Sequence, residues 1–195
     1  MPTTCNSVPC NPSGTSYASV VTLIDGNFEV FGYWDEPFLR GDYFDHRIVD
    51  YFAELIKTKH GKDISNDRIS LGKLRTACED AKKALSSQDH VQVTIGSLFD
   101  GVDFSEPFSR SKFEELNGDL FSKLIALVDS VMVQARLERR RNRIDEIVPI
   151  GGSAMIPKIQ NLVKDYFGER EPNIRVKPDE IVALESSVVY VHSDN

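Results

Sequence analysis

Hydrophobic positions near the start of the chain follow first a strand-like and then a helix-like spacing. Residues 17–23 and 28–34 are rich in apolar side chains and flank Asp25-Gly26-Asn27, where glycine can supply the positive φ of a tight turn. A β-hairpin is therefore predicted. From Phe44 to Ile56 the apolar residues recur at helical spacing, which predicts a helix that ends near Gly61.

A second helix is predicted from about residue 66 to residue 86. At about 100° per residue its apolar side chains fall within one sector of the helix. These are Leu74, Ala77, Cys78, Ala81 and Leu85. Four polar side chains fall together on the opposite, solvent-facing side: Glu79, Lys82, Lys83 and Ser86.

The alternation at Val91, Val93 and Ile95 predicts a half-buried strand, which a turn at Gly101 follows. A long helix is then predicted to run from Ser109 or Ser111 to about Arg141. Ser111-x-x-Glu114 is a candidate capping box for its first turn.

The stretch "IDEIVPIGGSAMIPKIQNLVKDYF", residues 144–167, predicts a strand over 146–150, a glycine turn and a helix with Pro157 in its first turn. Such a turn suits a ligand that lies against the backbone, although it also serves as a plain sharp connection. We expect this strand to be central in its sheet, and Pro149 conflicts with that position because proline removes a ladder hydrogen bond. Residues 180–191 begin with a helical pattern and end in a β-branched run, so both states stay open.

The pattern as a whole predicts an α/β protein with hairpins and long helices. A length of 195 residues fits one domain or two small subdomains, and 41% hydrophobic with 27% charged residues is ordinary for a globular protein. The net charge of −7 argues against a nucleic-acid-binding surface. We interpret the run Arg139-Arg140-Arg141 as a solvated helix end, with a contact to an acidic partner as the sharper alternative.

Membrane and metal chemistry receive no support from the sequence. No apolar stretch approaches the roughly 20 residues that a spanning helix needs, and the start "MPTTCNSVPCNPSGTS" does not have the pattern of a signal peptide. Cys5, Cys10 and Cys78 have no metal-ligand spacing, so we expect no metal site and no disulfide framework.

Several long motifs resemble one known family. "RTACEDAKKALSSQ", "SLFDGVDFSEPFSRSKFEELNGDLF", the stretch 144–167 and "VKPDE" together look like the ATPase domain of the seventy-kilodalton heat-shock chaperones. The segments "KHGKDIS", "FDGVDFSEP" and "KDYF" are most similar to the endoplasmic-reticulum branch of plant type, the binding immunoglobulin proteins. The resemblance covers the chain from about Gly14 to Asp179.

The resemblance implies half of a two-lobed, actin-like ATPase fold. The chain matches only the second lobe, with a mixed sheet flanked by helices and an upper helical and hairpin subdomain. Residues 1–16 then form an irregular leader with a degenerate phosphate loop. Residues 17–39 and 109–195 form the sheet-bearing base, and residues 40–108 form the upper subdomain.

The resemblance also implies which residues face an adenosine nucleotide. Glu79 and Lys82 match residues that contact the ribose, and Ser86 matches one that reaches the adenine. Lys83 stands where the family usually has a stacking arginine, and an ammonium lacks that flat surface. Gly151, Gly152 and Ser153 match the backbone turn at the nucleoside and α-phosphate. Met155 replaces a flanking arginine of the family, and Asp179 matches an aspartate near the adenine.

The phosphate end is expected to be lost. The family's Asp-Leu-Gly-Gly-Gly-Thr-Phe-Asp motif corresponds to "CNPSGTSY", residues 10–17, in which only Gly14 and Thr15 are kept. Cys10 and Tyr17 replace the two aspartates, and Pro12 has no backbone N–H to offer. We therefore expect weak binding of ATP or ADP with loss of magnesium coordination, and no catalytic residue.

Several alternatives stay open at this stage. The chain could instead be an interaction module for chaperone nucleotide-exchange factors or co-chaperones, or a regulator of the full-length chaperone. It could also be a non-functional remnant, and an active ATPase is disfavoured by Cys10, Pro12 and Tyr17. The cytoplasm is the default location, with the endoplasmic-reticulum lumen as the alternative that the resemblance offers; neither a nucleic acid nor a membrane is an expected partner.

Overall fold

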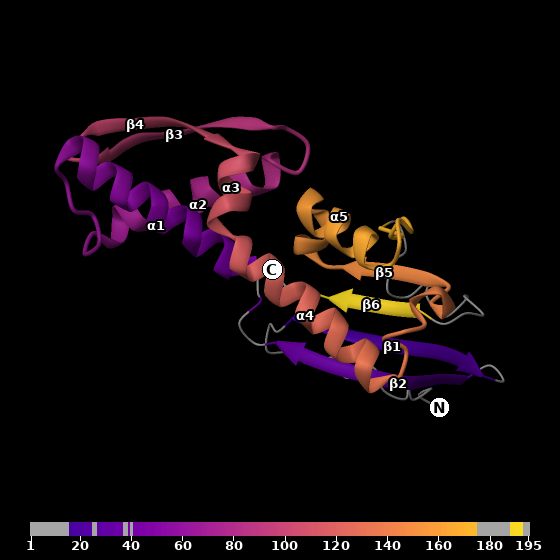
Figure 1. Ribbon diagram of the computed structural model, residues 1–195. Helices are drawn as coiled ribbons and strands as arrows, with labels where there is room; N and C mark the ends of the chain where they lie inside the picture. Colours follow the sequence, from indigo (N-terminus) through magenta and orange to yellow (C-terminus); the bar gives the residue numbers. More distant parts are fainter. Residues whose placement is uncertain (1–15, 25–26, 37–38, 40, 175–187, 193–195) are drawn as a thin grey trace, which may run out of the picture. The chain divides into compact units, whose positions relative to one another are not determined.

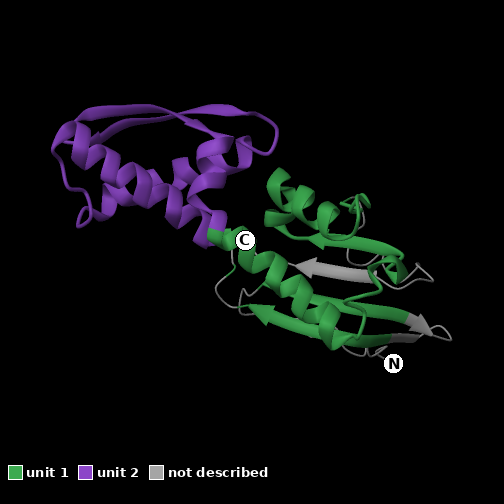
Figure 2. Cartoon of the chain, viewed as in Figure 1, with its two compact units in different colours: residues 1–41, 119–195 green, residues 42–118 purple. Residues whose placement is uncertain are grey.

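The computed structural model describes residues 16–24, 27–36, 39, 41–174 and 188–192. The chain forms two compact units, which Figure 2 colours separately. Unit 1 comprises residues 1–41 and 119–195, and unit 2 comprises residues 42–118. Both units combine helices with β-strands, so the predicted α/β class is confirmed.

Unit 1 is built on a mixed sheet with the strand order β2-β1-β6-β5. Its strands are β1 (Ser16–Ile24), β2 (Asn27–Glu36), β5 (Glu146–Ile150) and β6 (Val188–His192). β1 runs antiparallel to β2 and β6, and β5 runs parallel to β6 (Figure 1). The predicted hairpin and the strand at 146–150 are confirmed, and the end of the open stretch 180–191 is a strand; residues 175–187 lie outside the described part.

The position of β5 resolves the conflict at Pro149. Among the strands that the structure describes, β5 lies at the edge of the sheet and pairs only with β6. An edge strand needs ladder bonds on one side alone, so it accepts a proline more easily than a central strand does. The prediction of a central strand was therefore wrong.

A β-bulge in β2 shifts the pairing of this strand with β1 by one residue. Val20 pairs with Gly32 while Val21 pairs with Val30, so Phe31 is the extra residue. α4 (Gly118–Gln134) crosses this part of the sheet (Figure 1). A Cβ atom added to Gly32 would lie only 2.7 Å from the carbonyl oxygen of Val131. The close approach of strand and helix therefore requires glycine at this position.

The long helix predicted from Ser109 or Ser111 to Arg141 is two helices, α3 (Arg110–Leu116) and α4. The break lies at Asn117, whose side-chain Nδ2 donates to the carbonyl oxygen of Phe113 at 2.8 Å. This bond satisfies the Phe113 carbonyl from a side chain, and the chain turns at Asn117 before α4 begins at Gly118. Ser109 is the N-cap, since its Oγ accepts from the backbone N–H of Lys112 at 3.1 Å. The capping box at Ser111 was a wrong prediction.

α4 ends before the arginine run. The backbone N–H of Leu137 donates to the Met132 carbonyl at 2.8 Å, and that of Arg136 donates to the Val133 carbonyl at 2.9 Å. Arg136 itself has a φ of 58°, so these two hydrogen bonds form a Schellman motif at the end of α4. Residues 139–141 thus lie beyond the helix in a series of turns, and the prediction of a helix end there was wrong.

Unit 2 consists of two helices against a two-stranded sheet, with α3 completing it. α1 (Gly41–His60) and α2 (Arg68–Ala84) confirm the predicted helices, and β3 (His90–Phe99) confirms the predicted strand. β4 (Val102–Ser109) pairs antiparallel with β3 and was not predicted, because Asp103, Ser105 and Glu106 interrupt its apolar pattern. In Figure 1 the two helices lie along one face of this sheet.

Phenylalanine side chains fill the space between the sheet and the helices of unit 2. Phe52 of α1 contacts Phe104 and Phe108 of β4, with ring centroids 5.6 and 5.3 Å apart. Phe44 at the start of α1 contacts Phe113 of α3 at 6.1 Å. Rings at these separations add to the stabilisation from their buried area.

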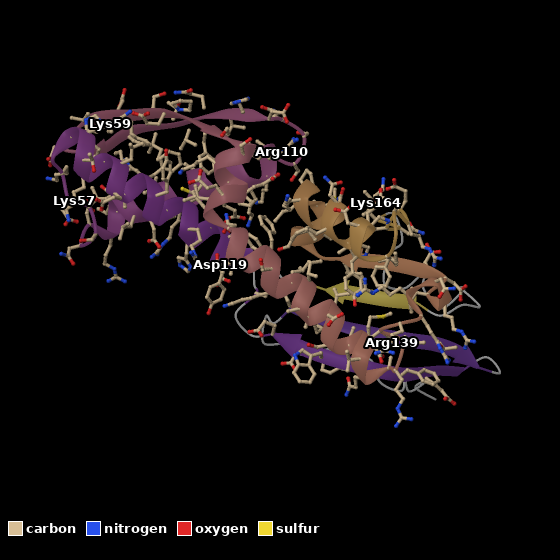
Figure 3. The ribbon with its side chains drawn as sticks, viewed as in Figure 1. Lys57, Lys59, Arg110, Asp119, Arg139 and Lys164 are labelled. Carbon is tan, nitrogen blue, oxygen red and sulfur yellow. The ribbon has the colours of Figure 1, made fainter. Side chains whose placement is uncertain are left out.

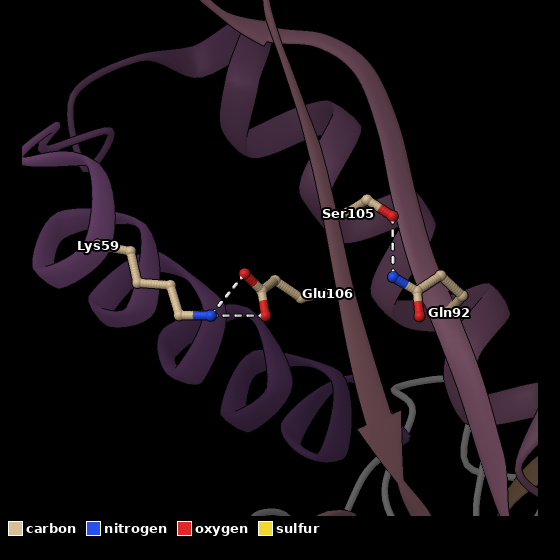
Figure 4. Close-up of polar contacts among 4 residues, drawn as sticks. All are labelled: Lys59, Gln92, Ser105 and Glu106. Carbon is tan, nitrogen blue, oxygen red and sulfur yellow. Dashed lines mark hydrogen bonds and ion pairs between the residues drawn. The ribbon is translucent and has the colours of Figure 1, made fainter.

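Polar contacts complete the hairpin of unit 2 (Figure 4). Lys59, in the last turn of α1, donates to both oxygens of Glu106 at 2.7 and 2.8 Å. On the sheet, Gln92 donates from Nε2 to the Ser105 hydroxyl at 2.9 Å. These contacts explain how a strand with so many polar residues is held in place.

Candidate functional site

α2 carries four of the predicted site residues, and its start is well defined. Asp67 is the N-cap, and its carboxylate accepts from the backbone N–H groups of Ile69 and Ser70 at 3.0 and 3.2 Å. Hydrogen bonds from the Ser70 side chain and backbone lower the pKa of Asp67. The helix therefore begins at a fixed residue, which fixes the rotation of the side chains that follow.

The predicted apolar side of α2 is confirmed except that Ala77 is only half-buried. Cys78 lies in this core, and burial raises the pKa of its thiol to about 12. An unreactive, protonated thiol is therefore expected at neutral pH.

Lys82 does not lie on the solvent-facing side of α2. Its side chain is only 9% exposed, and its Nζ lies 2.7 Å from Oδ2 of Asp45 on α1, itself 20% exposed. The pairing explains how a lysine enters a buried position, because a buried charge needs a partner. The prediction that all four polar residues face solvent was wrong for Lys82.

Asp45 was not identified from the sequence, although it is the residue that fixes Lys82. Burial raises the pKa of Asp45, while the hydrogen bond and charge of Lys82 oppose that rise. Its second oxygen, Oδ1, is buried and accepts no hydrogen bond within the described residues. The contact spans 37 residues along the chain, so no local pattern could reveal it.

Glu79 and Lys83 pair with each other at the surface of α2. Lys83 Nζ lies 2.6 Å from Glu79 Oε1, with the two side chains 56% and 46% exposed. The hydrogen bond and charge of Lys83 lower the pKa of Glu79, and Glu79 raises the pKa of Lys83 in turn. Solvent screens an exposed pair at this spacing, so the pair stabilises the helix little and either side chain can turn to another partner at small cost.

Ser86 lies just after α2, in a turn that Arg110 holds. The Ser86 backbone N–H donates to the Lys83 carbonyl at 3.1 Å. Arg110 donates from Nε to the carbonyl of Leu85 and from Nη2 to that of Gln88, both at 2.9 Å. Figure 3 labels Arg110, which sequence reasoning missed because its partners precede it by more than 20 residues.

The glycine turn of unit 1 has the geometry predicted for it. β5 ends at Ile150, and Gly151 takes a φ of 95°, a value that L side chains rarely adopt. Residues Gly152–Met155 form one 3₁₀ turn, and α5 (Pro157–Tyr166) follows with Pro157 in its first turn, as predicted. Ser153 is buried, whereas Met155 is 52% exposed.

Gln160 stabilises this turn from the following helix. Its Nε2 donates to the carbonyl oxygen of Ala154 at 2.8 Å. The contact fixes the 3₁₀ turn against α5, and the Ala154 N–H in turn donates to the Gly151 carbonyl at 3.1 Å. The sequence offered no signal for this role, because a glutamine on a helix is ordinary.

The remaining predicted residues divide as follows. Asp179, Gly14 and Thr15 lie outside the described residues. Tyr17 lies in β1, with its ring centroid 5.7 Å from that of Tyr33. Glu79, Lys82, Lys83 and Ser86 belong to unit 2, and Gly151, Gly152, Ser153 and Met155 belong to unit 1. The structure brings Glu79 together with Lys83, whereas it pairs Lys82 with Asp45.

Within the described ranges, no three His, Cys, Asp or Glu side chains are grouped as a metal ion would require. None of the helices described is both long and apolar enough to cross a membrane.

Comparison with known proteins assigns this architecture to the actin-like ATPase fold class. The sequence profile of the family described as Hsp70 protein matches residues 13–191. The chain belongs to the Hsp70 family, as its motifs had indicated.

Three relatives show the extent of the similarity. The chain is 48% identical over 186 residues to "Heat shock 70 kDa protein BIP3" of Oryza sativa subsp. japonica. It is 43% identical over 175 residues to "Heat shock 70 kDa protein" of Neurospora crassa and to "Heat shock cognate 70 kDa protein 3" of Dictyostelium discoideum. The alignments cover 93%, 90% and 90% of this chain but only 28%, 27% and 28% of the relatives.

Proposed function

We propose that this chain is the second-lobe part of an Hsp70 ATPase domain that binds adenine nucleotides weakly and hydrolyses them little or not at all. Unit 1 corresponds to the sheet-bearing base of the lobe, and unit 2 to its upper helical subdomain. The boundaries at residues 41/42 and 118/119 replace the sequence-based ones at 39/40 and 108/109 in this proposal.

The observation that supports nucleotide binding most is the turn at Gly151. Gly151 has a positive φ, and the 3₁₀ turn Gly152–Met155 and the proline-started α5 follow it, at the position that the resemblance assigns to the nucleoside. Ser153 is buried and Gln160 holds the turn, so this shape is fixed by contacts of unit 1 alone. A preformed backbone surface lowers the cost of ordering on binding.

The residues of α2 support a modest contribution from unit 2. Glu79 and Lys83 are exposed and exchangeable, and Ser86 lies half-buried beside them in sequence. Lys82 would contact a ribose through its ammonium, which is already paired with Asp45. Because its charge is already balanced, we expect Lys82 to favour hydroxyl groups rather than phosphate.

The residues present do not fit magnesium and the outer phosphates. Tyr17 places a phenol where the family has a carboxylate, and its ring contacts Tyr33. Hydrolysis of a phosphate bond requires metal or dense positive charge at the transferred group. The residues support contact with the nucleoside end of a nucleotide and no step at its phosphates.

Isothermal titration with adenosine and ADP tests this proposal. If contacts worth about 4 kcal/mol are missing relative to a complete cleft, the Kd rises roughly a thousandfold, so titration needs millimolar ligand. We expect adenosine and ADP to bind with similar Kd values, and Ser86→Trp to weaken both. Glu54→Ala, an exposed change on α1, is the matched control. No heat at millimolar ligand, or steady phosphate release from ATP, would contradict the proposal.

A second function rests on a different observation. Unit 2 is one continuous segment with its own aromatic core, and the family's exchange factors grip the upper subdomain. We therefore also consider an interaction module that competes with a full-length chaperone for such a factor. The chain should slow factor-stimulated nucleotide release from an intact chaperone. If this experiment and the titration are both negative, the remnant interpretation is favoured.

The location of the protein stays a prediction. Similarity to a relative named BIP3 supports the endoplasmic-reticulum lumen over the cytoplasmic default. Imaging of the tagged protein, expressed from its native transcript, together with a marker of the endoplasmic-reticulum lumen decides between the two locations.

A further inference from the structure

Residues 136–143, which we call the arginine turn, carry an unusual concentration of positive charge. They contain five arginines and one glutamate, a net charge of +4 in a chain whose total is −7. All five arginines are exposed. The proposed nucleotide-binding function makes no use of them.

The backbone of the arginine turn is folded into consecutive hydrogen-bonded turns. The N–H of Arg140 donates to the carbonyl of Leu137 at 2.8 Å, and that of Arg143 donates to the carbonyl of Arg140 at 2.9 Å. Residues Arg141–Arg143 form a 3₁₀ turn, and Ile144 after it is fully buried. A stretch that would span about 26 Å when extended is thereby gathered into a compact surface.

Arg141 is the member that fixes this surface to unit 1. Its guanidinium carbon lies 3.8 Å from the centroid of the Tyr166 ring, and its Nη2 lies 3.6 Å from Asp129 Oδ1. The Tyr166 hydroxyl donates to the same Asp129 oxygen at 2.7 Å. Helices α4 and α5 therefore both hold Arg141, and the nearby carboxylate is occupied.

The other four arginines have no such partner among the residues that the structure describes. Within the described part of the chain, no ion pair joins Arg136, Arg139, Arg140 or Arg143 to a carboxylate. Figure 3 labels Arg139 beside the end of α4 in unit 1. Five positive charges within eight residues repel one another, so the binding of an anionic group near them is favoured.

We propose that the arginine turn binds an acidic segment of a partner protein. Guanidinium groups bind carboxylates through two parallel N–H···O bonds, and this preference suits aspartate and glutamate side chains. The arginine turn precedes β5, whereas the glycine turn follows it, and a five-residue strand spans about 16 Å. The surface is therefore separate from the glycine turn.

The charge of the whole chain favours a short acidic peptide over a nucleic acid. A peptide with three or four carboxylates covers only the arginine turn. An extended polyanion would also meet the acidic remainder of a chain with net charge −7. The preformed turns reduce the ordering cost for a short ligand.

Fluorescence anisotropy with a labelled probe of four alternating glutamate–serine pairs tests the proposal on the full chain. We expect binding that weakens as salt rises from about 50 to 200 mM, because exposed charges are screened. The double variant Arg139→Ala/Arg140→Ala should weaken binding at least about tenfold, equivalent to about 1.4 kcal/mol. Circular dichroism verifies that the variant is folded.

The matched control is Arg68→Ala/Arg75→Ala, which removes two exposed arginines from α2. It changes the net charge equally and should leave the affinity unchanged. The proposal is overturned if this control weakens binding as much, or if a glutamine–serine probe binds equally well. Tighter binding of a single-stranded oligonucleotide or of anionic vesicles than of the acidic probe also overturns it.

Discussion

Lys82 makes contacts that differ from those its position in the sequence suggests. Helical spacing places it with Glu79 and Lys83, yet its aliphatic chain is buried and its ammonium meets Asp45. Desolvation of both charges offsets much of their attraction, so the pair contributes little net stability. The pair instead fixes the position of the Lys82 ammonium between α1 and α2.

Breaking this pair from one side should cost far more than removing it completely. Lys82→Met leaves Asp45 buried and unpaired, and we expect a loss of about 3 kcal/mol in the free energy of unfolding. The double variant Asp45→Leu/Lys82→Met should have a free energy of unfolding within about 1 kcal/mol of that of the natural chain. Urea denaturation measures both.

The titration of Asp45 gives an independent check on the same pair. Lys82 opposes the rise of the Asp45 pKa, so Lys82→Met should raise that pKa further. A carboxyl with a raised folded pKa contributes more stability as the pH falls through that value, because the folded state then takes up the proton first. The deficit of Lys82→Met should therefore shrink on acidification, and an unchanged deficit between pH 7 and about 4 would refute this account.

At the scale of elements, the cap of α2 predicts the opposite pH dependence. Hydrogen bonds from Ser70 lower the pKa of Asp67 below its usual 3.8. Its contribution is therefore present above pH 3.8 and is lost as the pH falls through the folded pKa. Asp67→Ala should lower the melting temperature at pH 7, and this difference should diminish below pH 3.8, as thermal circular dichroism can measure. Asp67→Asn, which keeps an acceptor oxygen, should cost less at pH 7.

Two glycines should respond to alanine with opposite signs. At Gly32 the new Cβ would meet the Val131 carbonyl at 2.7 Å, so Gly32→Ala should destabilise unit 1 by about 1–3 kcal/mol. At Gly72, inside α2, nothing lies within 4 Å, so Gly72→Ala should stabilise by about 0.5–1 kcal/mol through helix propensity. Equal effects at the two positions would show that the strand–helix approach at Gly32 is not tight.

Local patterns were sufficient to predict the hairpin, α1, α2, β3, β5 and α5, because each has a regular apolar spacing, an apolar run or a turn residue within its own segment. They failed where a side chain replaces a backbone bond, as Asn117 does between α3 and α4. They failed again at β4, where polar residues are held by partners on other elements. The pairing of Lys82 with Asp45 and the role of Arg110 depend on contacts distant in sequence, which periodicity does not contain.

At the scale of the whole molecule, unit 2 is an insertion between two halves of unit 1. The ring contact between Phe44 and Phe113 brings the two ends of the insertion together. An insertion whose ends are adjacent constrains its host little, because the host chain needs no long gap.

We therefore expect residues 42–118, expressed alone, to fold cooperatively. Domains of this size can stand alone when they hold a closed core, and the aromatic side chains of α1, α3 and β4 form one here. A single sigmoidal urea transition and dispersed proton chemical shifts would agree with this. A fragment without a transition would show that unit 2 depends on its host, and Phe52→Ala is the variant that should abolish folding.

Arg136 ends α4 in the left-handed region, where glycine is the usual residue. An L side chain is strained there by about 1–2 kcal/mol. Arg136→Gly should therefore raise the melting temperature of the protein while it removes one positive group from the surface that follows. If the same substitution also weakens binding of the glutamate–serine probe, Arg136 contributes a charge to ligand binding while it lowers the stability of the fold.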